Sequence, residues 1–161
     1  MLFRSEFEDN DERTIFFVRG VMETVKKLRW TPDVIHCQGW MTALAPLYIK
    51  KAYNDDPFFK NSKVVYSLFA DEFKKPFRSL FAERLLLEGI EKRHVVQVKD
   101  KVIDFVALSK LAIDYSDAVI QSSPVVNEDV LKYVVSKKLK FLPYVSGEEY
   151  ADDYVNFYDS L

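Results

Sequence analysis

Cysteine and long apolar runs are scarce in this sequence, and each scarcity excludes a class of protein. A single cysteine, Cys37, excludes a disulfide framework and is typical of a reducing compartment, so we expect a cytoplasmic location. No apolar run approaches the roughly 18 residues of a membrane-spanning helix. The first residues, MLFRSEFEDNDER, are acidic and lack the apolar stretch of a secretory signal. The sequence therefore predicts no role in a membrane.

Glycine and positive charge are also limited. Only four glycines occur in the 161 residues, where about 11 would be average. No glycine-rich phosphate loop of the Rossmann or Walker type is present. The 23 basic and 25 acidic residues leave a net charge of −2, so nucleic acid is not an expected partner. Two histidines and one cysteine show no metal-ligand spacing. We therefore expect neither a metal nor a cofactor.

What is present is the composition of one compact domain, with 48% hydrophobic and 15% aromatic residues. Apolar periodicity predicts an alternation of helices and short strands. The expected helices span 9–29, 39–53 with a bend at Pro46, 74–88, 103–115 and 123–135, and a last one carries Tyr150, Tyr154, Phe157, Tyr158 and Leu161 on one face. The expected strands span 33–37, 63–69, 117–121 and 140–145. This alternation predicts an α/β fold, a Rossmann-like parallel sheet flanked by helices.

Two helix starts carry the pattern of a capping box, in which the first residue and the residue three positions later cap each other's backbone. Asp9 with Glu12 is expected to open the first helix. Ser146 with Glu149 is expected to open the last one. Ser123 followed by a proline is expected to open the helix that ends near residue 135.

Ligands of such sheets bind beyond the carboxyl ends of the strands, which are residues 36–40, 69–71 and 121–124. At the first end, Trp40 offers a flat apolar face for a sugar ring and Gln38 offers hydrogen bonds to hydroxyls. The alternative is that His36 is a satisfied core histidine and that Trp40 only packs.

Neighbouring residues of a strand point to opposite faces of the sheet, so His36 is not placed to activate Cys37. Cys37 is expected to be a buried structural thiol. The acidic pair Asp71 and Glu72 is interpreted as a solvated turn. We therefore predict no catalytic residue.

Four blocks of sequence together carry a resemblance. They are NDER before an apolar helix, PDVIHCQGWMTALAPLYIKKAY, KVVYSLF and ALSKLAIDYSDAVIQSSP. In order and spacing they resemble bacterial glycogen and starch synthases, which are retaining glucosyltransferases that use ADP-glucose and have a two-domain GT-B fold. The resemblance covers residues 9–135 and the later half of the synthase N-terminal domain. The ending EEYADDYVNFYDSL resembles short single-domain relatives associated with the Bacteroidetes.

This resemblance implies that residues 1–161 form one synthase-like, partial GT-B N-terminal domain without its first strands and without the nucleotide-binding C-terminal domain. The family pattern at the first strand end is H-x-H-D-W. His36 and Trp40 match it, Gln38 replaces the histidine that touches the transferred glucose, and Gly39 replaces the aspartate.

The later blocks match unevenly. The next strand of the family ends Y-T-I-H-N, and here Phe69 and Ala70 replace its histidine and asparagine. In the last block, Lys110 and Ser123 match the family. Scaffold positions are thus kept, while several polar site positions are lost.

The resemblance implies a domain of glucan biosynthesis whose ligand is an α-glucan or ADP-glucose. The candidate ligand-binding residues are His36, Gln38, Trp40, Lys110 and Ser123. We expect no glucose transfer by this chain alone, because the family's K-x-G-G-L loop and its diphosphate-binding domain have no counterpart here. The alternatives are a non-catalytic glucan- or protein-binding regulatory module and a purely structural or oligomerisation domain.

The lost first strands would leave a sheet edge and an apolar face open. We therefore expect either self-association or a partner chain that covers them, or that Met1 begins a fragment of a longer protein.

Overall fold

The computed structural model describes residues 7–87, 89–99, 101–147 and 150–161. Its centre is a sheet of four parallel strands in the order β1-β2-β3-β4. The strands are β1 (Val34–Gln38), β2 (Lys63–Leu68), β3 (Ala118–Gln121) and β4 (Lys140–Leu142). The predicted Rossmann-like α/β fold is confirmed.

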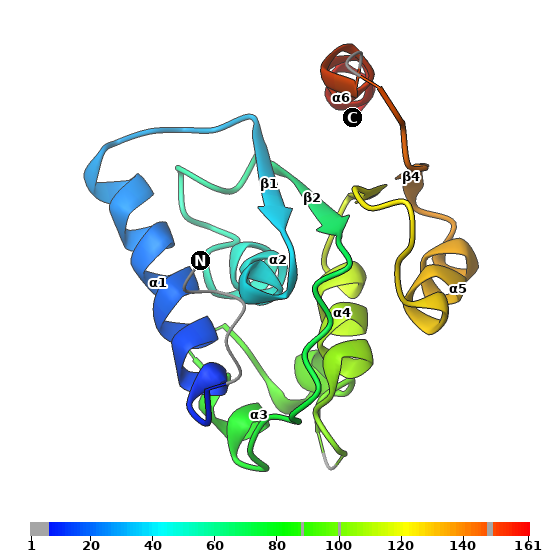
Figure 1. Ribbon diagram of the computed structural model, residues 1–161. Coiled ribbons are helices and arrows are strands. Elements are labelled where there is room, and N and C mark those ends of the chain that lie inside the picture. Colours follow the sequence, from blue (N-terminus) through cyan, green and yellow to red (C-terminus); the bar gives the residue numbers. More distant parts are fainter. Residues whose placement is uncertain (1–6, 88, 100, 148–149) are drawn as a thin grey trace.

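The helices lie on both sides of this sheet. They are α1 (Asn10–Lys27), α2 (Ala45–Leu47), α3 (Phe81–Arg84), α4 (Phe105–Asp114), α5 (Glu128–Lys137) and α6 (Tyr150–Asp159). Right-handed connections between strands in sequential order place every connecting helix on the same face. Figure 1 shows this arrangement, with α2, α4 and α5 on one side of the strands and α6, drawn red, on the other. Among the described residues, no helix is both long and apolar enough to cross a bilayer.

The main core lies between the sheet and its connecting helices. Alternate residues of β2, among them Val64 and Tyr66, point into this side and are buried. Leu108 and Leu111 of α4 are fully buried against them. The apolar stripe expected over 103–115 thus forms α4 and covers the sheet.

The opposite face of the sheet is covered by α6. Val65, Ala118 and Ile120 are fully buried on this face, although α6 itself has no fully buried residue. The residues that pack on them from the last helix and the chain end are Tyr154, Phe157, Tyr158 and Leu161. The expected open apolar face is therefore not observed on the sheet, because the aromatic stripe of the last helix folds back over it. The expected open edge is observed in the described residues, where β1 is an edge strand.

Three expected helices differ from those observed. Residues 39–53 form a 3-10 turn (Trp40–Thr42), the short α2 and a π-helix (Tyr48–Ala52) instead of one bent helix. Pro46 lies inside α2 and has no N–H to donate, so a regular helix cannot continue through it.

Residues 74–88 were expected to form a helix, but among the described residues of that range only α3 is helical. Phe77 instead pairs with Ile103 in an isolated antiparallel bridge. The helix expected from Ser123 begins later, at Glu128, because the Asn127 side chain accepts the backbone N–H groups of Asp129 and Val130.

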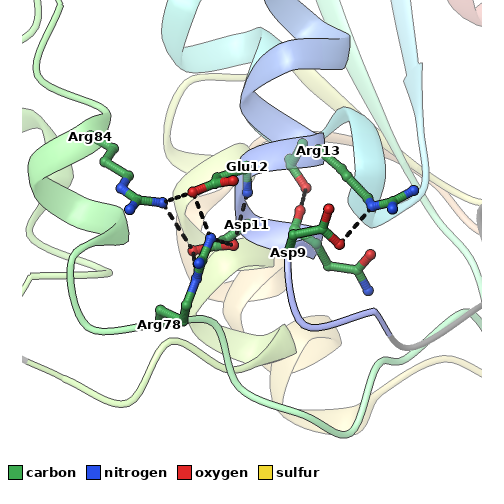
Figure 2. Close-up of polar contacts among 8 residues, drawn as sticks. Asp9, Asp11, Glu12, Arg13, Arg78 and Arg84 are labelled. Atoms are coloured by element: carbon green, nitrogen blue, oxygen red, sulfur yellow. Dashed lines mark hydrogen bonds and ion pairs between the residues drawn. The ribbon is translucent and has the colours of Figure 1, made fainter.

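The capping box expected at Asp9 is also wrong, because the Asp9 side chain bonds to Arg13 instead of the helix backbone. The capping box expected at Ser146 lies partly outside the described residues. Figure 2 shows where the other acidic side chains of the first turn point. Asp11, only 1% exposed, accepts two hydrogen bonds from the Arg78 guanidinium, at 2.7 and 2.8 Å.

Glu12 also faces Arg78, at 2.9 Å, and forms an ion pair with Arg84 of α3 (Figure 2). Carboxylates in the first turn are favourable because the free N–H groups make this end of the helix positive. The ion pairs therefore tie the start of α1 to the loop that follows β2.

Candidate functional site

A cavity of about 380 Å³, the strand-end cavity, lies beside the carboxyl ends of β1 and β2. Its lining includes Gln38, Trp40, Thr42, Phe69, Asp71 and Ser123. Three of the five predicted ligand-binding residues, Gln38, Trp40 and Ser123, are thus brought together. The Ser123 hydroxyl also accepts the Ala70 N–H at 3.0 Å, which joins the loops after β2 and β3.

The turn after β1 depends on Gly39 and Asp71. Gly39 has a φ of 73°, in the region that favours glycine. A Cβ at this position would overlap the Asp71 carboxylate. That carboxylate accepts the Trp40 N–H at 3.1 Å. Asp71 was expected in a solvated turn, but it is half-buried and fixes the floor of the cavity.

Trp40 is only 5% exposed. Its ring packs edge-on against Phe73 and Phe77, with ring centres 5.2 and 6.0 Å apart. Most of the Trp40 side chain therefore packs in the core, as in the alternative interpretation. Only its small exposed part faces the strand-end cavity.

His36 points to the α6 side of the sheet and does not line the strand-end cavity. Its Nδ1 is 2.8 Å from the Tyr158 hydroxyl and 3.5 Å from the Gln38 amide, and its Nε2 bonds to the Ser67 hydroxyl. Burial lowers the pKa of His36 below its ordinary value of 6.5. These contacts match the alternative of a satisfied histidine.

Lys110 and Cys37 lie away from the cavity. The Lys110 ammonium is 5.2 Å from the centre of the Tyr133 ring, between α4 and α5, so any role in ligand binding stays a prediction. Cys37 is buried on the helix side of the sheet, and burial raises the pKa of its thiol to about 12. Among the described residues, no group of three or more His, Cys, Asp or Glu could hold a metal ion.

A larger groove of about 630 Å³ runs along α1 and is mostly apolar. Phe16, Leu28 and Trp30 line it, and Phe16 is 82% exposed. The strand-end cavity differs from this groove because it combines an amide and hydroxyls with apolar walls.

The sequence did not reveal two contacts that organise this region. Asp71 was missed because a carboxylate after a strand is usually solvated. The pairing of Tyr158 with His36 was missed because the two residues are 122 positions apart. The aromatic stripe of the last helix indicated a buried face but not what that face would cover.

The comparisons with known sequences all match starch or glycogen synthases. The sequence model of the starch synthase catalytic domain matches residues 2–142. Glycogen synthase of Clostridium perfringens is 36% identical over 118 residues, which are 71% of this chain and 23% of that protein. Glycogen synthase of Clostridium botulinum (strain Eklund 17B) is 31% identical over 135 residues, which are 83% of this chain and 28% of that protein. The chain thus spans less than a third of these relatives.

A comparison of folds agrees. The structure resembles the catalytic domain of starch synthase IV from Arabidopsis thaliana, solved with ADP and acarbose, with a TM-score of 0.67 and 17% identity. The likeness covers 89% of this chain and 31% of that one. At this level of identity it shows that the four-stranded sheet and its helices have the fold of part of that catalytic domain.

Proposed function

Because this chain belongs to the starch synthase catalytic-domain family, we propose that it acts in glucan biosynthesis by binding an α-glucan in the strand-end cavity. The observation that carries the proposal is the lining of that cavity. Gln38, Thr42 and Ser123 provide neutral hydrogen-bonding groups beside the apolar Phe69. A sugar presents the same mixture of hydroxyls and apolar C–H surface, and about 380 Å³ lies within the usual range of ligand pockets.

The charge of the cavity favours a neutral glucan over a nucleotide sugar. Among the described residues that line it, Asp71 is the only one with a charged side chain. A carboxylate at this place opposes the diphosphate of ADP-glucose. The proposed ligand is therefore the glucan acceptor, and the proposed place of action is the cytoplasm.

The same site supports a binding role without glucose transfer by this chain alone. Gln38 and Phe69 stand where the resembling synthases have histidines. An amide and a phenyl ring have no proton to exchange near neutral pH. Transfer also needs positive groups that stabilise the leaving diphosphate, and the strand-end cavity offers a negative one.

Titration calorimetry with maltoheptaose tests the binding role. We expect Gln38→Ala to weaken binding about fivefold, which corresponds to the loss of about one hydrogen bond. Asn61→Ala is the matched control, because this exposed amide precedes β2 at the opposite end of the strand. Equal affinities of the two variants, or no binding by the wild type, would contradict the proposal.

A second assay tests the absence of transfer. Wild type and Gln38→His are incubated with labelled ADP-glucose and glycogen, and incorporation of label into the glycogen is measured. We expect no incorporation with either protein. Incorporation by the wild type would show that this chain stabilises the leaving diphosphate in another way.

A further inference from the structure

A second cavity, of about 370 Å³, lies next to the strand-end cavity, and we name it the tyrosine cavity. Its lining includes Gln38, Phe69, Ser122, Tyr144, Tyr150 and Tyr154. Gln38 and Phe69 line both cavities. The two cavities are therefore adjacent and share one wall.

The tyrosine cavity exists because the C-terminal segment folds back onto the sheet. Tyr154 of α6 is fixed there by a hydrogen bond of 2.9 Å between its hydroxyl and that of Ser122, at the end of β3. One turn further along α6, Tyr158 is held by His36. These two hydrogen bonds hold α6 against the sheet. They therefore fix the position of the side of the cavity that α6 forms.

Two other tyrosines of this segment remain exposed at the cavity. Tyr150 is 53% exposed and Tyr144, between β4 and α6, is 41% exposed. The Tyr150 ring stands at 80° to that of Tyr154, with centres 5.7 Å apart. The two rings therefore pack edge to face, and both line the cavity. Gln38 and Ser122 add polar groups to the same lining.

Aromatic faces beside amide and hydroxyl groups suit the alternating C–H and O–H surface of a sugar. We propose that the tyrosine cavity is a second carbohydrate subsite, added by the C-terminal segment, for glucose units of a glucan chain that also occupies the strand-end cavity. The inference rests on the proposed function and extends it. It predicts a preference for chains long enough to occupy both cavities, since each cavity has room for only part of such a chain.

Titration calorimetry with maltose and with maltoheptaose tests this subsite. We expect Tyr150→Ala and Tyr144→Ala each to weaken maltoheptaose binding about fivefold to tenfold and to leave maltose binding unchanged. Tyr150→Phe keeps the ring and should bind maltoheptaose nearly as the wild type does. Val155→Ala is the control, because this exposed residue of α6 does not line the cavity.

Comparing Tyr150→Ala with Tyr144→Ala also shows whether weaker binding is caused by a loss of structure. Tyr144 lies outside α6, so its replacement leaves the helix intact, and hydrogen exchange of the α6 amides checks that the helix stays on the sheet. Wild-type affinity of both alanine variants for maltoheptaose, with weakened binding by Gln38→Ala, would overturn the second subsite alone. A wild type that binds neither sugar would overturn the proposed function together with it.

Discussion

The two faces of the sheet are covered in different ways. On one face, α4 buries residues such as Leu108 and Leu111 completely. On the other face, α6 covers three fully buried sheet residues, yet none of its own residues is fully buried. Two hydroxyl hydrogen bonds, made by Tyr154 and Tyr158, add to this thin apolar contact.

Covering a face of a sheet and stabilising that face are therefore separate matters. Burial of a side chain on all sides contributes most to the free energy of unfolding, whereas an element with few buried contacts opens locally. We expect the face under α4 to carry most of the stability of the chain. The face under α6 is expected to open first.

The largest effect is expected on the α4 face. Leu111→Ala should lower the free energy of unfolding by about 2–5 kcal/mol, because it removes a fully buried side chain and leaves a cavity. Urea denaturation followed by circular dichroism measures it. Val135→Ala, at an exposed position of α5, is the control and should change little.

A smaller effect is expected on the α6 face. Phe157→Ala should lower the free energy of unfolding by roughly 1–2 kcal/mol, since this side chain is only partly buried against the sheet. The same urea titration gives the value. A loss as large as that of Leu111→Ala would show that the two faces contribute equally.

The hydrogen bond to His36 is expected to contribute less again. Tyr158→Phe removes the hydroxyl and should cost about 0.5–1.5 kcal/mol. Faster hydrogen exchange of the α6 amides would report it. Unchanged exchange of these amides would mean that ring packing alone holds the helix.

The smallest effect is expected from pH. The pKa of His36 is lowered by burial under α6, so the covered state binds this proton more weakly than the open state does. The contribution of His36 to docking is present above its ordinary pKa of 6.5 and is lost as the pH falls below that value.

Protection factors of the α6 amides at about pH 7.5 and about pH 5.5 measure this change, and we expect lower protection at the acidic value. His36→Gln should abolish the pH dependence. His94→Gln should retain it, because His94 lies in the 3-10 turn Lys92–Val95 and bonds there to the Glu91 N–H. Equal pH dependence of all three proteins would exclude His36 as its source.

Much of the sheet could be predicted from the sequence. The strands β1, β2 and β3 match the expected ranges within one residue at each end. They are short runs of buried residues between turn signals, which local patterns reveal well. The helices α1, α4 and α6 follow from apolar stripes of the same local kind.

The failures have long-range causes. Among the described residues of 74–88 only α3 is helical, because Phe77 pairs with Ile103 and packs its ring against Trp40. Ser123 does not cap a helix, because its hydroxyl accepts the Ala70 N–H from the neighbouring strand end. Neither partner is near in sequence, so no local pattern could indicate it.

The candidate site was predicted only in part for the same reason. Gln38 and Ser123 face the strand-end cavity, as expected for residues at the carboxyl ends of strands. Lys110 was selected by resemblance. It lies over Tyr133, away from this cavity, and its role in ligand binding stays a prediction. The tyrosine cavity was not foreseen, because it forms only when the chain end returns to β1.

The sequential strand order has a consequence for synthesis on the ribosome. Each strand adds to the edge left by the previous one, so the sheet can assemble in the order in which its residues are made. The ten residues of α6 emerge only after all four strands have been made. Until then Val65, Ala118 and Ile120 face water, and the nascent chain displays the apolar surface that the finished protein conceals.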